Sequence, residues 1–322
     1  MPSDTVIDCH VHLAAFADGA NGCSISPRML KSPLFRFLSW KHGLSAERAS
    51  ESNWKYVDDL LTELRRSQHV RQVVLLGMDG VYAANGWLDE EKTDFLVGND
   101  YVLNLARSYP QEFLPGVSIN PQRRDTLDEL DRCVAAGAVL VKVLPNSQGF
   151  DPGDRRYAPF YRKLAQLKMP LLSHVGYEFT MAGRDQSAGD PDRLRTALDE
   201  GVTVIAAHGC SSGLVFYEPY FPTFQALARL YTNFFADVSA LTLPNRFGLL
   251  LRLRGHPELH DRLLFGTDYP HLVFHWPCRG QVGAGSLLEI GRTDNRFDKQ
   301  YLLLKYLGVG VRSIGDLLRV PA

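Results

Sequence analysis

The sequence predicts a (β/α)₈ TIM barrel, built as a single domain over residues 1–322, and three observations favour this fold. Short apolar runs alternate with segments of helical period along the whole chain, which is the pattern of a parallel sheet with crossover helices. Eight such units in a chain of 322 residues favour a closed barrel over an open doubly wound sheet. The first predicted strand also lacks the glycine fingerprint of a dinucleotide-binding fold.

Eight apolar runs are the predicted strands, and segments of helical period lie between them. The strands are expected at residues 5–9, 72–78, 113–119, 138–144, 170–173, 203–207, 234–238 and 263–266. The clearest helix is 53–68, where apolar residues recur on one face. This face carries Trp54, Val57, Leu60, Leu61 and Leu64. The remaining helices are expected at 102–108, 126–136, 159–167, 191–200, 223–230 and 297–307.

The loops that follow the strands are uneven, and the longest is an insertion at residues 14–52 after the first strand. It contains Gly, Ser, Pro and aromatic residues without strong periodicity, and loops of that length are usually functional or disordered. One hypothesis is that it covers the site at the carboxyl-terminal mouth of the barrel through Arg28, Phe35, Phe37 and Trp40. The alternative is a surface elaboration that helps the chain to oligomerise.

Composition narrows the partners and the compartment. The formal net charge is -1 and no block of like charges stands out, so nothing indicates nucleic acid or an anionic membrane as a partner, and a small-molecule substrate is expected. The five cysteines are scattered without a Cys-x-x-Cys pair, which argues against a disulfide framework or a thiolate zinc site. With no leader and no apolar run of membrane-spanning length, we expect a soluble cytoplasmic protein.

Candidate metal ligands lie at or near the ends of five predicted strands. Strand alternation places His10 and His12 on one side and Ile7, Cys9 and Val11 on the other, and two imidazoles on a rigid strand form half of a zinc site. The further candidates are Lys142 in the fourth strand, His174 after the fifth, His208 after the sixth and Asp268 after the eighth. Functional residues of such barrels lie at these strand ends.

Each candidate has an ordinary structural alternative. A lone His-x-His is more often structural than metal-binding, His174 and His208 could be hydrogen-bonded core histidines, and Asp268 could start a turn. Structural histidines, however, have no reason to gather at one mouth of a barrel. The joint pattern therefore predicts one or two divalent ions, with Zn²⁺ as the first choice and Mn²⁺ as the alternative.

Lys142 needs its own explanation, because an ammonium group on a buried strand is costly. One hypothesis is a carbamate formed with CO₂, which is an anionic ligand able to bridge two metals. The other is a lysine that extends to the barrel mouth and pairs with Asp268 or with a substrate carboxylate.

Four motifs resemble those of the amidohydrolase superfamily. They are DCHVH at 8–12, LSHVG at 172–176, AHG at 207–209 and LFGTDYP at 264–270. The run NFFADVS at 233–239 also resembles a seventh strand of that superfamily. The chain is most similar to the amidohydrolase-related branch, which includes aminocarboxymuconate semialdehyde decarboxylase, resorcylate decarboxylases and dicarboxylate lactonases.

The resemblance implies that four of the candidates hold the first metal: His10, His12, His174 and Asp268. It makes His208 either a second-metal ligand or a catalytic acid/base. Lys142 departs from the decarboxylase pattern and is similar to the bridging lysine of the two-metal hydrolases. Members of the family often form dimers, so the resemblance also implies a homodimer.

The leading functional hypothesis is a metal-dependent hydrolase of a lactone, ester or amide in a small molecule, carboxylated or not. Bound Zn²⁺ lowers the pKa of water from about 15.7 to roughly 7 and so supplies a nucleophile. Asp268 would carry the proton to the leaving group, and protonated His208 would stabilise the oxyanion. The alternatives are a non-oxidative decarboxylase or hydratase on the same site, and a barrel that binds its ligand without turnover.

Substrate contacts are expected from the loops. The candidates are Tyr177, Glu178, Arg184, His271, His275, Asn120 and, from the insertion, Trp40. Arg184 or Arg123 would suit a substrate carboxylate through bidentate bonding, although a solvated surface arginine is the commoner case.

Overall fold

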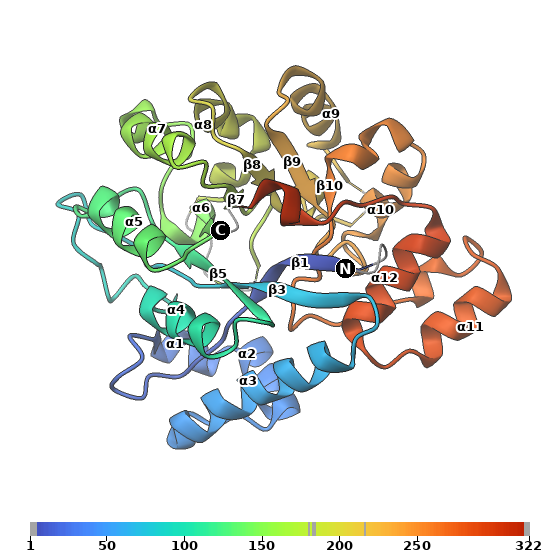
Figure 1. Ribbon diagram of the computed structural model, residues 1–322, viewed down its shortest axis with the longest axis horizontal. Coiled ribbons are helices and arrows are strands. Elements are labelled where there is room, and N and C mark those ends of the chain that lie inside the picture. Colours follow the sequence, from blue (N-terminus) through green and yellow to red (C-terminus); the bar gives the residue numbers. More distant parts are fainter. Residues whose placement is uncertain (1–4, 180, 182–184, 216, 319–322) are drawn as a thin grey trace.

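Eight parallel strands form the centre of the molecule, as the computed structural model shows for residues 5–179, 181, 185–215 and 217–318 (Figure 1). In sheet order they are β1 (Val6–His12), β3 (Val70–Leu76), β5 (Phe113–Ser118), β6 (Leu140–Val143), β7 (Leu171–Ser173), β8 (Val204–Ala206), β9 (Phe234–Asp237) and β10 (Leu263–Leu264). Each strand pairs in parallel with the next. Backbone bonds from Cys9 N to Phe265 O and from His12 N to Tyr269 O join the two edges. The predicted (β/α)₈ barrel is therefore confirmed.

Helices surround the sheet (Figure 1). They are α3 (Ala49–Arg66), α4 (Asn99–Ser108), α5 (Thr126–Ala135), α7 (Ala158–Gln166), α8 (Arg195–Asp199), α9 (Phe221–Leu230), α10 (Phe247–Arg254), α11 (Ala284–Arg292) and α12 (Arg296–Leu307). Short helical turns are α6 (Pro145–Gln148), η2 (Arg155–Tyr157), η3 (Gln186–Gly189), η4 (Pro191–Leu194), η5 (Ala207–Cys210), η6 (Pro257–Arg262), η7 (Trp276–Cys278) and η8 (Ile314–Leu317). Within the described residues, no helix has both the length and the apolar character needed to cross a membrane.

Two helix predictions need correction, and two helices are additional to the predicted set. Helix α3 begins at Ala49, within the predicted insertion, and the predicted helix 191–200 divides into η4 and α8. Helices α10 and α11 were not expected. In α10 the run from Leu249 to Leu251 and Leu253 places leucines on several faces, so the sequence shows no 3.6-residue period there.

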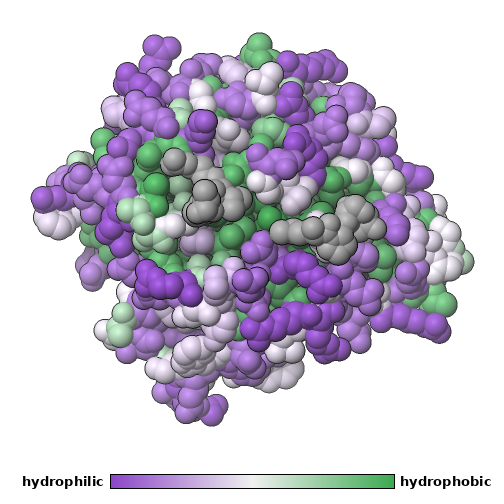
Figure 2. Space-filling model, in the orientation of Figure 1, coloured by the Kyte–Doolittle hydropathy of each residue, from purple (hydrophilic) through white to green (hydrophobic). Residues whose placement is uncertain are grey.

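One apolar layer fills the inside of the barrel, and a second fills the space between the strands and the surrounding helices. The inner layer holds Cys9, Leu140, Leu172, Ile205 and Leu264, and the outer layer lies between strands and helices. In the view of Figure 2, hydrophilic residues dominate the periphery and hydrophobic ones gather toward the middle.

The alternation predicted for the first strand is wrong at Cys9, which packs in the inner layer although His10 also faces inward. The register of β1 against β3 shifts between Asp8 and Val11, so an extra residue is accommodated there as a β-bulge. The bulge lets Cys9 fill the barrel while His10 and His12 both reach its mouth.

The insertion at 14–52 is more ordered than its sequence suggests. It contains β2 (Ser24–Ile25), α1 (Pro27–Lys31), α2 (Pro33–His42) and η1 (Ala46–Arg48). Proline begins α2, and Gly43 ends it with a φ of 65°, which are ordinary helix boundary signals.

The insertion is fastened to the loop after β3. Strand β2 pairs antiparallel with β4 (Phe95–Leu96), and Arg28 binds both carboxylate oxygens of Asp94. A methyl group built on Gly98 would lie 3.0 Å from the carbonyl oxygens of Asn21 and Gly22, so the two backbones touch. Arg28 therefore anchors the insertion to that loop.

Candidate metal centre

Three donor atoms from opposite ends of the chain meet at the mouth of the barrel. His10 Nε2 lies 3.2 Å from His12 Nε2 and 3.4 Å from Asp268 Oδ1, and His12 Nε2 lies 3.1 Å from the same oxygen. Asp268 follows β10 with a φ of 63°, and its backbone N–H donates to His10 O at 2.9 Å. The closure of the barrel thus brings Asp268 to the histidine pair.

These three atoms suit a divalent ion. Ligands about 2.1 Å from a tetrahedral zinc lie about 3.4 Å apart, close to the observed separations of 3.1–3.4 Å. Two imidazole nitrogens and one carboxylate oxygen also match the donor preference of Zn²⁺ and similar ions. The residues present therefore fit the metal that the sequence predicts.

Asp237, a residue without a predicted role, orients His10. Its Oδ2 lies 2.8 Å from His10 Nδ1. Burial opposes ionisation of Asp237, but His10 and neighbouring hydrogen bonds hold its pKa below the ordinary value. An ionised carboxylate only accepts, so His10 Nδ1 carries the proton and the Nε2 lone pair faces His12 and Asp268, as in metal-bound histidines.

His174 and His208 form the other side of the centre. His208 Nε2 lies 3.2 Å from His174 Nδ1. The Nε2 atom of His174 is buried without a hydrogen-bond partner among the described residues, and Glu178 Oε2 is 3.7 Å away. A buried, unpartnered ring nitrogen costs free energy, and a metal ligand or a substrate group would satisfy it.

His208 is held from behind by the same carboxylate that orients His10. Its backbone N–H donates to Asp237 Oδ1 at 2.9 Å, and its Nδ1 lies 2.8 Å from Ser239 Oγ, which donates to Asp237. Nδ1 of His208 therefore carries the proton.

Burial and the neighbouring Arg246 hold the pKa of His208 well below its usual range. This shift disfavours the protonated form near neutral pH, and the oxyanion role expected of a protonated His208 stays a prediction.

His10, His208 and Asp237 also bring donor atoms within 4.8 Å of one another. The nitrogens that face Asp237 and Ser239 are the Nδ1 atoms, and both lie within hydrogen-bond distance of these side chains. This trio is a hydrogen-bond network behind the centre and not a second ion site.

Lys142 lies in β6 and points to the same centre. Its Nζ is 3.2 Å from His10 Nε2, and the side chain is fully buried. Burial lowers the pKa of Lys142 to about 8, against the opposing effect of Asp237 and Asp268. Across the described part of the chain no carboxylate lies within 4.0 Å of Nζ, so the predicted pairing with Asp268 is not formed. The carbamate stays a prediction.

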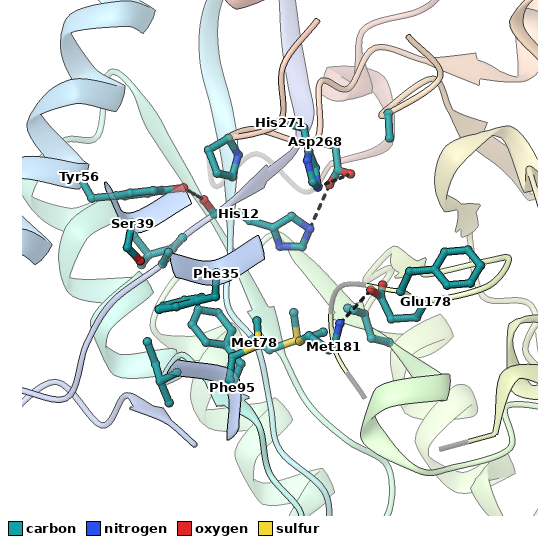
Figure 3. Close-up of a pocket in the computed structure, with 18 of the residues that line it drawn as sticks. His12, Phe35, Ser39, Tyr56, Met78, Phe95, Glu178, Met181, Asp268 and His271 are labelled. Atoms are coloured by element: carbon teal, nitrogen blue, oxygen red, sulfur yellow. Dashed lines mark hydrogen bonds and ion pairs between the residues drawn. The ribbon is translucent and has the colours of Figure 1, made fainter. Parts of the chain in front are cut away.

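A cavity of about 370 Å³ lies over this centre and joins it to the insertion. We call His10, His12, His174, His208 and Asp268 the metal-site floor. The apolar wall comprises Phe16, Ile25, Met29, Phe35, Leu44, Met78, Phe95 and Met181. In Figure 3, His12, Asp268 and His271 lie together, and Phe35, Met78, Phe95 and Met181 group on another side of the pocket. The cavity therefore combines a polar reacting end with an apolar body.

The structure brings some predicted substrate residues to the cavity. Tyr177, Glu178 and His271 line it, and His271 Nε2 is 3.7 Å from Asp268 Oδ2. Phe35 lines it as well, whereas Phe37 and Trp40 are 52% and 77% exposed on the outside of the insertion.

Other candidates lie elsewhere. Asn120 is buried behind the cavity, where its amide donates to the carbonyl oxygens of Gly80 and Gln148. Arg123 pairs with Asp125 at 2.9 Å, and His275 packs beside Gly291. Arg184 lies outside the described residues.

Two further residues at the cavity carry no sequence signal. Arg246 is buried, precedes α10 and lines the cavity. Tyr56 of α3 also lines it and donates its hydroxyl to His12 O at 2.7 Å. Neither belongs to a motif, and Asp237 alone lies in a run that resembled the superfamily.

Known proteins share this architecture. An uncharacterised TIM-barrel protein from Bordetella bronchiseptica is 19% identical, with 94% of this chain and 99% of that one covered and a TM-score of 0.60. A probable 2-pyrone-4,6-dicarboxylic acid hydrolase from Acinetobacter baumannii is 15% identical, with coverage of 94% and 99% and a TM-score of 0.53. A 2,6-dihydroxybenzoate decarboxylase from Rhizobium is 16% identical, with coverage of 94% and 99% and a TM-score of 0.52.

These structures share the fold, and the sequence assigns the family. A comparison with curated proteins gave no match. The amidohydrolase family model, by contrast, matches residues 7–289 and includes both histidines of β1, His174, His208 and Asp268. The chain belongs to the amidohydrolase family.

Proposed function

We propose that this amidohydrolase uses a divalent ion, Zn²⁺ in the first instance, to hydrolyse a lactone, ester or amide bond in a small molecule. The observation that supports it most directly is the group of three donor atoms 3.1–3.4 Å apart at the base of the cavity. His10, His12 and Asp268 would hold the ion, with His174 as a further ligand. A bound divalent ion lowers the pKa of water to roughly 7 and polarises a carbonyl group.

Asp268 has the properties of a proton carrier. Burial opposes its ionisation, but His10 and His271 hold its pKa well below the ordinary value, so it is a carboxylate at neutral pH. Oδ1 faces the histidine pair, and Oδ2 faces His271 at 3.7 Å. In the proposal Oδ2 accepts a proton from the attacking water and returns it to the leaving group.

We propose that His208 acts in its neutral form, as an acid/base, in place of the protonated oxyanion stabiliser. Because Nδ1 donates to the Ser239 hydroxyl, Nε2 is an acceptor directed toward His174. In the proposal His208 accepts a proton or a hydrogen bond from the substrate.

A non-oxidative decarboxylase or hydratase on the same floor is the second candidate. The wall favours it, because Phe35, Phe95 and Met78 present apolar surface that fits an aromatic ring. The similar structures include both a pyrone dicarboxylate hydrolase and a dihydroxybenzoate decarboxylase.

Product analysis separates the two candidates. Protein loaded with zinc is incubated with a panel of lactones and aryl esters and with a panel of aromatic acids, while proton release and CO₂ release are recorded in parallel. Hydrolysis predicts proton release that Asp268→Asn abolishes. CO₂ release without any lactone or ester turnover would make the decarboxylase the leading candidate in place of the hydrolase. Binding without turnover on either panel would leave a ligand-binding barrel.

The small-molecule partner, the homodimer and the cytoplasmic location stay predictions. Light scattering on the purified chain tests the dimer, for which a mass of about twice 36.1 kDa is expected.

A further inference from the structure

Arg246 places a buried guanidinium at the edge of the reaction cavity. It lines the cavity together with His174, His208 and Asp268, and its side chain is buried. Nη1 donates to Ser211 O at 3.0 Å. Burial lowers its pKa against the opposing effect of more distant carboxylates, which agrees with a cation withdrawn from water.

This guanidinium has no carboxylate in contact with it. In the described ranges no acidic oxygen lies within 4.0 Å of Arg246, although Arg296 pairs with Glu63 at 2.6 Å and Arg193 with Asp151. The nearby Glu218 instead accepts from Ser211 Oγ at 2.6 Å and from Ser212 N at 2.9 Å. Buried charges in proteins are normally paired, so Arg246 has capacity for an anion.

The loop around Gly213 packs closely against the guanidinium of Arg246. A methyl group built on Gly213 would lie 3.0 Å from Arg246 Nη2 and 3.1 Å from its Cζ, so the backbone at Gly213 packs closely against the guanidinium. Asn245 also lines the cavity, and its side-chain amide donates to Gly213 O at 2.9 Å, which holds the loop beside the arginine. The fixed contacts set the orientation of a group with five N–H donors.

The rest of the cavity suits an apolar body. Its volume is about 370 Å³, whereas an apolar cavity of about 150 Å³ is enough to bind benzene. The apolar wall therefore has room for a ring with a side chain. A substrate that satisfied both features would carry its charge at one end and its apolar group at the other.

We propose that Arg246 binds the carboxylate of the substrate, and that the substrate class is a monocarboxylate with an aryl or comparable apolar body packed against the apolar wall. A guanidinium forms two parallel hydrogen bonds with a carboxylate. The identity of the bond that is broken rests on the proposed function, whereas the recognition of a carboxylate does not.

Binding of a matched pair of probes tests the proposal independently of turnover. Calorimetry on the zinc-loaded full chain compares 3-phenylpropionate with 3-phenylpropanamide, which has the same shape without the charge. We expect the acid to bind at least tenfold more tightly, and Arg246→Met to reduce this preference to twofold or less. Arg254→Met is the matched control, because Arg254 is exposed on the adjoining helix α10, and it should keep the full preference.

Two further variants test the geometry of the guanidinium and the contact with the apolar wall separately. Arg246→Lys retains the charge without the bidentate geometry and should weaken binding of the acid about threefold to tenfold, which also covers the case in which Arg246→Met does not fold. Phe35→Ala should weaken 3-phenylpropionate and leave acetate unchanged. Equal binding of acid and amide to the wild type overturns the proposal. A preference for the acid that survives in Arg246→Met also overturns it, because the ion would then be the carboxylate receptor.

Discussion

The metal-site floor, through His12, His174, His208 and Asp268, and the apolar wall line the same cavity but are held by different means. Each side chain of the floor emerges at a strand end, and His10 and His208 have a second hydrogen-bonded partner behind them in Asp237 or Ser239. The wall depends on van der Waals contact and on a few links to the insertion, such as Arg28 with Asp94. The difference indicates that the reaction is fixed by the barrel and that substrate choice is set by the attached segments.

The junction between the two regions lies on α3. Asn53 accepts from Phe16 N at 2.8 Å and donates to Phe16 O at 2.9 Å, and Tyr56 donates to His12 O. One helix thus holds both the start of the wall and the backbone of a floor histidine. Substitutions in the metal-site floor should lower the reaction rate and the metal content. Substitutions in the apolar wall should change only the affinity for the substrate.

The largest effect is expected from Asp268→Asn. The change removes the anionic ligand and the proposed proton acceptor together, so kcat should fall by about a thousandfold or more, and metal content should drop below half an equivalent. Steady-state rates and elemental analysis provide the measurement. Asp261→Asn, at an exposed position before β10, is the control. An active, metal-loaded Asp268→Asn would remove Asp268 from the centre.

Asp237→Ala tests the support behind the floor. Loss of the partner of His10 Nδ1 should weaken metal affinity by about tenfold to a hundredfold, as for other carboxylates behind metal-bound histidines. Competition with a chelator measures the affinity, and circular dichroism checks the fold. A metal affinity within twofold of the wild type would show that packing against the inner apolar layer orients His10 without Asp237.

The pH dependence of stability sharpens the same comparison in the metal-free protein. Burial lowers the pKa of His12 from 6.5 to about 4, so between these values the unfolded chain binds a proton that the folded chain does not. The folded protein therefore carries no penalty from this group above pH 6.5 and loses stability as the pH falls through this range, by roughly 3 kcal/mol in total once the pH is below 4.

Urea unfolding of the wild type and of His12→Gln at pH 7.5, 5.5 and 4.5 measures this contribution. The variant should lose less stability than the wild type over that range. Parallel losses in the two proteins would contradict the assignment to His12.

The smallest effect is expected from the wall. Phe35→Ala removes a ring that lines the cavity and should raise KM by about fivefold to tenfold with kcat within twofold, because the lost contact is the same in the ground and transition states. Trp40→Ala is the control, since Trp40 is 77% exposed, and it should change neither constant. A fall in kcat with Phe35→Ala would mean that the wall also positions the reacting bond.

The floor could be predicted from sequence far better than the wall. His174 and His208 directly follow short apolar runs, Asp268 comes two residues after another, and in a closed parallel barrel such positions fall on one rim. Lys142 was placed near the centre on the same basis. The bulge at Cys9 could not be predicted, because it depends on the register of β1 against β3.

The wall could not be predicted because its order comes from contacts between distant segments. Strand β2 has two residues and forms only against β4, which lies far along the chain. Trp40 was a reasonable candidate as an aromatic residue in a long loop, yet α2 directs it outward. Arg246 gave no signal, since the leucine-rich helix that it precedes showed no clear period.

The pairing of β2 with β4 means that the insertion and the loop after β3 behave as one unit at the cavity entrance. A ligand too bulky for the space between them must displace both segments. Because the backbone at Gly98 is in close contact with Asn21 and Gly22, neither segment can move without the other. New specificities should therefore arise by paired changes in residues 14–52 and 94–98, and transplanting either segment alone into a related barrel should fail to transfer substrate preference.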